Sequence, residues 1–104
     1  MTKNRLVVSD AAATDVVEQA DWYSTQSGKD LAERWEAAVT SAIMRALHRP
    51  STGTPCHFQA AELHDLRRTA ISGFPRHLLF YRFDRRVVFI LRVVHGARNL
   101  EALL

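Results

Sequence analysis

The sequence predicts an α+β domain in which an N-terminal strand and an antiparallel helical hairpin precede a three-stranded antiparallel sheet. Two observations indicate this class. Between residues 10 and 48, apolar residues recur at the three- and four-residue spacing of amphipathic helices. Between residues 63 and 95 they form dense runs rich in Val, Ile, Leu, Phe and Tyr, which favour strands. With 104 residues, 47% of them hydrophobic, the chain is expected to form one domain, 1–104, because a second core would have too few residues.

A short strand and a helix are expected at the start of the chain. Arg5–Val8 is an apolar run that suits an edge strand. Ser9 or Asp10 can cap the first helix, because a short side-chain oxygen there accepts hydrogen bonds from unpaired backbone N–H groups. The apolar stripe that follows, over residues 12–23, consists mainly of small side chains. It therefore permits close approach of a partner helix.

A second helix follows after a short break. Ser24–Gly28 interrupts the helical pattern, and Ser27 with Asp30 forms a capping pair for the next helix. The apolar face of this helix continues to His48, and Pro50 stops it. Two helices joined by a short break predict an antiparallel hairpin.

The last third of the chain is expected to form the sheet. Residues 49–60 are turn-rich and predict an irregular connection. The strands are expected at about Leu63–Ile71, Arg76–Phe83 and Val87–His95, with Asp84–Arg86 as the hairpin loop.

The length of this hairpin loop decides which side chains share a face. A two-residue loop needs positive φ at both positions, where Arg is unfavourable, so a three-residue loop that pairs Phe83 with Val87 is expected. The face predicted to pack on the helical hairpin is apolar through its middle and comprises His77, Leu79, Tyr81, Phe83, Val87, Phe89, Leu91, Val93 and His95. The opposite face comprises Arg76, Leu78, Phe80, Arg82, Val88, Ile90, Arg92 and Val94. A one-residue slip would mix the two sets.

Positive charge is concentrated in this sheet. Residues 67–98 carry eight arginines and one acid, a net +7, whereas the rest of the chain carries −4. The imbalance indicates an anionic partner: nucleic acid, an acidic protein segment or an acidic enzyme surface. Arg76, Arg82 and Arg92 lie among apolar residues and suit pairing with carboxylates. The other sheet arginines have a plainer interpretation as a solvated surface and a protected sheet edge.

Other reactive residues do not form a recognisable site. The five histidines lack metal-ligand spacing, so neither a metal nor a cofactor is expected. The single cysteine, Cys56, cannot form an internal disulfide. Trp22 and Trp35 are expected to pack in the core or the hairpin. No secretory signal and no apolar run of roughly 20 residues is present, which predicts a cytoplasmic protein with no membrane contact.

Several motifs resemble the ParE branch of the RelE/ParE toxins, which belong to bacterial type II toxin–antitoxin modules. The motifs are LRR (66–68), GFP (73–75), FYR (80–82) and LRVVHGARN (91–99), and the resemblance covers nearly the whole chain. It implies a toxin that poisons DNA gyrase, blocks replication and is neutralised by a ParD-like antitoxin in a hetero-oligomer. In this family the antitoxin usually carries the DNA-binding domain, so no direct DNA binding is expected of this chain.

The resemblance leaves two alternatives. RelE-type relatives cut messenger RNA in the ribosomal A site, a reaction that needs a base, an acid and cations around the phosphorane. No lysine follows Lys29 and no tyrosine follows Tyr81, which disfavours this chemistry. If the chain is a nuclease, the residues expected to act are Arg76, Arg92, His95 and Arg98. The other alternative is a degenerate, non-toxic member that still binds antitoxin.

Target and antitoxin binding is predicted to use basic and apolar residues of the sheet and the C-terminal tail. The set comprises Arg76, Phe80, Arg82, Arg92, His95, Arg98, Leu103 and Leu104. Exposed apolar residues in it predict a large hydrophobic contact with the antitoxin. His95 also has a structural interpretation, as a strand-end histidine that bonds to backbone.

Overall fold

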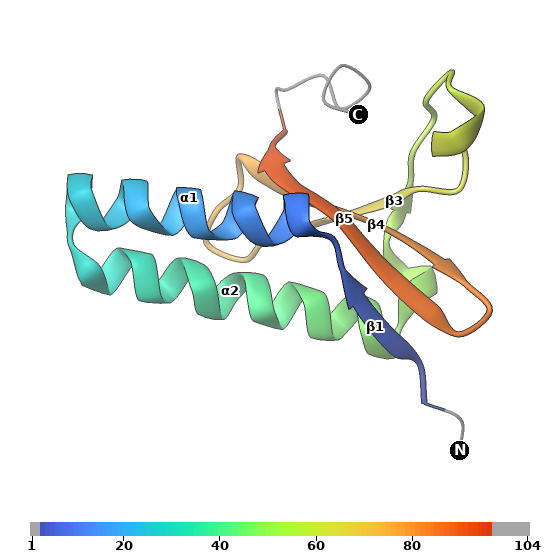
Figure 1. The fold of residues 1–104 in the computed structure, drawn as a ribbon, viewed down its shortest axis with the longest axis horizontal. Coiled ribbons are helices and arrows are strands. Elements are labelled where there is room, and N and C mark those ends of the chain that lie inside the picture. Colours follow the sequence, from blue (N-terminus) through green and yellow to red (C-terminus); the bar gives the residue numbers. More distant parts are fainter. Residues whose placement is uncertain (1–2, 97–104) are drawn as a thin grey trace.

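A computed structural model describes residues 3–96 of the chain as an α+β fold, in which two helices lie against a five-stranded mixed sheet (Figure 1). The elements are β1 (Arg5–Val8), α1 (Asp10–Ser27), α2 (Lys29–His48), β2 (Thr54–Pro55), β3 (Arg67–Ala70), β4 (His77–Asp84) and β5 (Val87–His95). The strands are ordered β1-β5-β4-β3-β2. The predicted three-stranded antiparallel sheet is therefore incomplete: β1 adds to β5 in parallel, and the short β2 adds to β3.

The link from β1 to α1 fastens the first helix to the sheet. The Ser9 backbone N–H donates to the Ile90 carbonyl (3.0 Å), and its hydroxyl donates to the Leu91 carbonyl (2.7 Å). The same hydroxyl accepts a hydrogen bond from the Ala12 N–H at 3.0 Å, so Ser9 rather than Asp10 is the helix cap. One side chain thus starts α1 and holds it beside β5.

The helical hairpin turns at a single residue, Gly28, between Ser27 and Lys29. Gly28 has φ 97°, a conformation that residues with a Cβ rarely adopt. The expected capping pair of Ser27 and Asp30 is wrong, because α1 continues through Ser27 and α2 has no side-chain cap. The end of α2 at His48 agrees with the prediction from Pro50.

The β4–β5 hairpin has a two-residue turn, and the predicted three-residue loop is wrong. Asp84 pairs with Val87, and the turn residues Arg85 and Arg86 adopt φ values of 49° and 66°. Mirror-image turns of this kind match the right-handed twist of the flanking strands, and this match outweighs the preference of Arg for negative φ. Further along, the pairing shifts by one residue between Phe80 and Tyr81, so that β5 contains a bulge.

The turn and the bulge together change which side chains of β5 face the helices and which face the outer side of the sheet. Val88 and Ile90, predicted on the outer face, are almost fully buried in the core beneath the helices. Phe89, predicted in that core, is 37% exposed, and Leu91 packs with the outer cluster. The bulge adds one residue to β5, which returns Val93 to the helix-facing side as predicted.

Each face of the sheet has its own apolar cluster. The main cluster lies between the helices and the sheet around Trp35, which is fully buried and donates its indole N–H to the Val16 carbonyl at 3.1 Å. The smaller cluster on the outer face comprises Cys56, Leu63, Leu66, Phe80 and Val94. The strand predicted at 63–71 shrinks to β3, because the chain before it forms a 3₁₀ turn at Ala61–Leu63 and the Leu66 N–H bonds back to the Leu63 carbonyl at 3.3 Å.

The connection from α2 to β3 is held by Tyr81 of β4. Its hydroxyl donates to the Pro50 carbonyl (2.6 Å) and accepts from the Gly53 N–H (2.9 Å), while Arg67 donates to the Gly53 carbonyl (2.7 Å). A Cβ at Gly53 would overlap the tyrosine ring and hydroxyl. Burial raises the pKa of Tyr81. This tyrosine therefore holds the loop in place.

Candidate functional site

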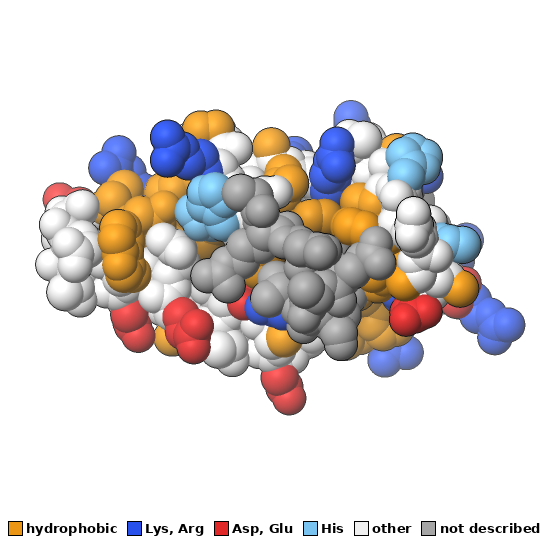
Figure 2. All heavy atoms as spheres, turned by 90° about the horizontal axis from the view of Figure 1, so that it is seen from above, with side chains coloured by type: hydrophobic (Ala, Val, Ile, Leu, Met, Phe, Trp, Pro, Cys, Tyr) orange, Lys and Arg blue, Asp and Glu red, His pale blue; other side chains and the backbone are white. Residues whose placement is uncertain are grey.

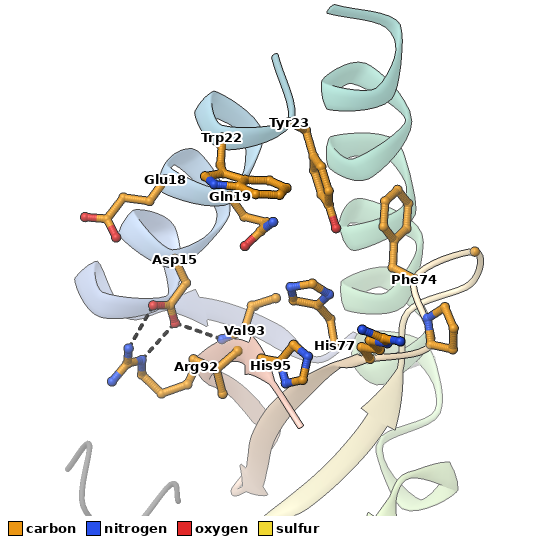
Figure 3. A pocket seen from close by; sticks show the side chains of 14 residues that line it. Asp15, Glu18, Gln19, Trp22, Tyr23, Phe74, His77, Arg92, Val93 and His95 are labelled. Atoms are coloured by element: carbon orange, nitrogen blue, oxygen red, sulfur yellow. Dashed lines mark hydrogen bonds and ion pairs between the residues drawn. The ribbon is translucent and has the colours of Figure 1, made fainter. Parts of the chain in front are cut away.

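An open cleft of about 850 Å³ lies where α1, the last residues of β5 and the β3–β4 turn meet (Figure 3). Helix α1 contributes residues at positions 15, 18, 19, 22 and 23, and the β3–β4 turn contributes 73–77. The end of β5 contributes residues 92–95. Three segments far apart in sequence therefore form one concave surface.

The inner wall of the cleft is a network of aromatic rings. Tyr23 and Phe74 line the cleft with ring centroids 5.5 Å apart, and the buried Trp35 lies 5.9 Å from the first and 5.2 Å from the second. Trp35 is also 4.8 Å from the imidazole of His77. Tilted and edge-on contacts at these separations are favourable for aromatic pairs. The wall is thus apolar and held by several mutual contacts.

Asp15 of α1 joins the helix to β5. Its carboxylate accepts hydrogen bonds from Nε and Nη2 of Arg92, both at 2.8 Å, and from the Val93 N–H at 2.9 Å (Figure 3). Both side chains are largely buried, with exposed fractions of 12% for Asp15 and 15% for Arg92. Strand β1 pairs with β5 only as far as Ile90. Beyond that residue, the Asp15 carboxylate accepts the hydrogen bond of the Val93 N–H in place of a neighbouring strand.

The electrostatics of this pair follow from its geometry. The hydrogen bonds from Arg92 to Asp15 raise the pKa of the guanidinium, with burial acting in the opposite direction. A bidentate pair of this kind directs two of the arginine's five N–H donors to one carboxylate. The positive charge of Arg92 is thus largely compensated inside the fold.

Two histidines face each other across the ends of β4 and β5. His77 pairs with His95 in the strand register, and their ring centroids are 5.6 Å apart. His77 is only 8% exposed. Burial lowers the pKa of His77, and the neighbouring His95 lowers it further. The neutral imidazole of His77 is therefore favoured.

The cleft brings together three of the residues predicted from the sequence, namely Arg76, Arg92 and His95. The predicted partners Arg98, Leu103 and Leu104 lie outside the described residues. The α1 residues Asp15, Glu18, Gln19 and Trp22 also line the cleft and were not predicted as part of a site. Their spacing follows one face of a helix, and this was the signal available in the sequence.

Phe80 and Arg82 lie away from this cleft. Phe80 is 6% exposed and belongs to the outer apolar cluster. Arg82 donates to the Glu62 carbonyl at 2.6 Å, and its Nε lies 3.5 Å from the Asp65 carboxylate, a distance that suits an ion pair better than a hydrogen bond. The predicted set is thus divided between the cleft and the region of the outer apolar cluster.

The two tryptophans also have different positions. Trp35 is in the core, one of the two positions predicted for the tryptophans, whereas Trp22 is 57% exposed and lies outside the core, on the helical hairpin. Trp22 lies at the rim of the cleft, where the neighbouring Tyr23 gives it its one ring contact among residues 3–96, at 5.7 Å. An exposed tryptophan at the edge of a concave surface is a common feature of binding sites.

The charges around the cleft are of both signs. In the left half of Figure 2, arginine or lysine side chains lie mainly along one margin and acidic side chains along the other, with hydrophobic side chains between them. No group of three or more His, Cys, Asp or Glu within residues 3–96 could hold a metal ion. In the same part of the chain, neither helix is long and apolar enough to cross a membrane.

The fold and the cleft define a small α+β domain with an aromatic, charged concave surface beside its helical hairpin. The family model for the ParE toxin of the type II toxin–antitoxin system parDE matches residues 6–100. This chain therefore belongs to the ParE toxin family, which confirms the resemblance seen in its motifs.

A solved structure described as the chromosomal ParDE toxin–antitoxin system from P. aeruginosa has a similar fold. The match has a TM-score of 0.74 at 15% identity and covers 89% of this chain and 96% of that one. No curated protein sequence matches the chain. The structural likeness thus extends over nearly the whole fold at low sequence identity.

Proposed function

We propose that this chain is a toxin that binds and inhibits DNA gyrase in the cytoplasm, arrests growth, and is neutralised by a ParD-like antitoxin. The observation that carries the proposal is the ParE family match over residues 6–100. The fold agrees, since its likeness to the P. aeruginosa ParDE structure covers 89% of this chain. Gyrase inhibition is what the ParE resemblance implies.

The geometry of the cleft supports binding over catalysis. Cleavage of RNA by its own 2′-hydroxyl needs cations at the phosphorane and a proton acceptor near the hydroxyl. Arg92 is held by Asp15 through two 2.8 Å hydrogen bonds, and the hydroxyl of Tyr81 is held by the loop at Pro50 and Gly53. Both side chains are engaged in holding the fold, which disfavours a catalytic role for either of them.

The direct test is a gyrase supercoiling assay with the purified toxin. Supercoiling should fall as toxin is added and recover when the antitoxin encoded by the adjacent reading frame is supplied in equal amount. Induction of the toxin alone in cells should stop DNA synthesis before protein synthesis. If protein synthesis falls first and gyrase stays active, the proposed target is wrong.

A messenger RNA endonuclease of the RelE type is the second candidate function. The observation that favours it is the presence of Arg76, Arg92 and His95 in one cleft. Cleavage of ribosome-bound messenger, abolished by Arg76→Ala or His95→Ala and retained by the exposed turn variant Arg85→Ala, would support it. Absence of growth arrest, with antitoxin binding intact, would instead indicate a non-toxic member.

A further inference from the structure

The end of the molecule that carries the β4–β5 turn and the start of β1 is rich in basic residues (Figure 1). The backbone N–H of Arg5 donates to the Arg86 carbonyl at 2.7 Å, which joins these two segments. The Asn4 side chain donates to the Leu47 carbonyl at 2.8 Å, so the end of α2 lies beside them. Five exposed basic residues lie in these three segments and are called the basic tip: Lys3, Arg5, Arg49, Arg85 and Arg86.

The charges of the basic tip are not compensated inside the described fold. Within residues 3–96, no hydrogen bond or ion pair engages any of its five side chains. Asp84 is the one acid in segments 3–5, 47–49 and 84–86, which together carry a net charge of +4. Seven of the eleven acidic residues lie between positions 10 and 36, in helices that lead toward the other end of the molecule. This separation of charge steers the protein, basic end first, toward an anionic partner.

The backbone of the β4–β5 turn indicates that its two arginines serve a purpose other than folding. Arg85 and Arg86 both have positive φ, 49° and 66°, a conformation for which Asn-Gly is far better suited. Residues held in sparsely populated conformations cost free energy, and they cluster at functional sites. The turn therefore sacrifices stability to display two adjacent guanidinium groups at the end of the hairpin.

The surroundings of the basic tip favour a phosphate backbone over an acidic protein segment as the partner. None of its five side chains lines the cleft beside α1 or the smaller pockets beside Leu66 and Phe89. Charged residues that contribute strongly to protein–protein binding lie in well-packed pockets that exclude water. Phosphate contacts instead use exposed cations, which gain free energy by releasing the counterions of the nucleic acid. A two-stranded β-ribbon such as β4–β5 also fits the major groove of duplex DNA.

We infer that the basic tip binds the phosphate backbone of duplex DNA. This DNA is the duplex held by gyrase, a partner that rests on the proposed function, so the toxin contacts the enzyme and its DNA together. No direct DNA binding was expected from the family resemblance, but phosphate contacts need no DNA-binding domain and read no sequence. With five cations, the logarithm of the association constant should fall by about 4 to 5 for each tenfold rise in salt concentration.

The first test measures binding of the toxin to a fluorescent DNA duplex of random sequence, by anisotropy over a series of salt concentrations. The double variant Arg85→Asn, Arg86→Gly replaces both turn charges by the residues that this turn prefers. Its melting temperature should be no lower than that of the wild type, because the strain at the turn is relieved. Its affinity for DNA at low salt should nevertheless fall about tenfold or more, and the salt dependence should decrease by about 2.

The control removes the same number of charges away from the basic tip. Lys29→Gln with Arg34→Gln changes two exposed residues in the first turns of α2, and it should alter DNA affinity less than about threefold. Equal losses in the two double variants would show that only net charge matters and would overturn the inference. So would wild-type binding to a polyglutamate peptide but not to the duplex, because the partner would then be an acidic protein segment.

The second test uses gyrase and separates this inference from the proposed function. The Arg85→Asn, Arg86→Gly toxin should need about tenfold more protein to inhibit supercoiling by half, while its calorimetric affinity for DNA-free gyrase stays unchanged. If both toxins inhibit gyrase equally and bind the duplex equally, the DNA contact is wrong while the toxin assignment stands. If the wild type binds the duplex through the basic tip but leaves gyrase active, the proposed target fails and the DNA contact remains.

Discussion

The two helices of this protein are joined at one glycine but have opposite roles. Five residues of α2 are buried in the main core, and they are Ala32, Trp35, Val39, Ala42 and Ala46. Helix α1 fully buries only Ala12 and Ala20, packs Val16 and Tyr23 partly against the core, and exposes Val17 and Trp22. Helix α2 is thus held mainly by the burial of apolar surface, whereas α1 presents much of its surface to solvent.

Helix α1 is instead positioned by a few polar contacts. Ser9 binds the Leu91 carbonyl, Asp15 binds Arg92 and Val93, and the Val16 carbonyl accepts the indole N–H of Trp35. Hydrogen bonds and buried ion pairs require defined geometry, whereas apolar contacts tolerate small shifts. The difference indicates that α2 supports the fold and that α1 shapes the cleft.

The largest expected difference between the helices is between their tryptophans. Trp35→Ala should lower the free energy of unfolding by about 3–5 kcal/mol, because it leaves a cavity in the core. Trp22→Ala should change it by less than about 0.5 kcal/mol, because that side chain is exposed. Urea unfolding followed by circular dichroism measures both. Similar losses for the two variants would contradict the division of roles.

Removing the carboxylate that holds α1 to β5 should have the next largest effect. Asp15→Ala takes from Arg92 its buried counter-ion and from Val93 its hydrogen-bond acceptor, and the expected loss of stability is about 3 kcal/mol. Glu18→Ala, one turn further along the same helix, is the matched control and should be nearly neutral. Thermal unfolding of the two variants would reveal whether α1 depends on this contact.

The start of each helix offers a smaller comparison. Ser9→Ala removes the cap of α1 and the bond to Leu91, and it should cost about 1 kcal/mol. Ser27→Ala, next to the start of α2, should cost less than about 0.5 kcal/mol because α2 has no side-chain cap. Both changes are measured as shifts in the urea concentration at the midpoint of unfolding, with the dependence of the free energy of unfolding on urea unchanged. An equal cost at Ser27 would mean that α2 is capped in solution.

The smallest expected effect is a pH dependence that comes from His77. Because burial lowers its pKa in the folded state, the unfolded chain binds more protons below pH about 6.5. Stability should therefore rise with pH from the folded pKa up to about 6.5 and then level off. His77→Gln should flatten this part of the stability curve.

The control for this prediction is His57→Gln in an exposed loop, which should keep the wild-type dependence of stability on pH. Stability measured by urea unfolding at intervals between pH 5 and 8 provides the comparison. If the dependence of stability on pH is unchanged in His77→Gln, His77 takes up its proton equally well in the folded and the unfolded state.

Local elements of the fold were predicted well. The bounds of β1 and β5 agree with the prediction, α2 ends at His48 before Pro50, and the α+β class is confirmed. Each of these depends on residues that are neighbours in sequence, because side-chain periodicity and proline act over a few residues. The ParE motifs were also readable from the chain alone.

The candidate site was predicted only in part, because it depends on the hairpin register and on contacts across the fold. Arg82 and Arg92 were assigned to one surface, yet Arg82 lies with Glu62 and Arg92 pairs with Asp15. No local pattern indicates that residues 15 and 92 meet. Trp22 was likewise indistinguishable from Trp35, since both lie in amphipathic helices.

The sequence by itself determined the class of fold, the family, and the order along the chain of β1, the two helices and the last three strands, because local periodicity and short motifs carry this information. Only the tertiary structure decided the two-residue turn at Arg85 and Arg86, the bulge in β5 and the burial of Val88 and Ile90. Strand twist and packing against the helices set these features. The same packing decided that Asp15 holds Arg92 and that Trp22 remains exposed at the cleft.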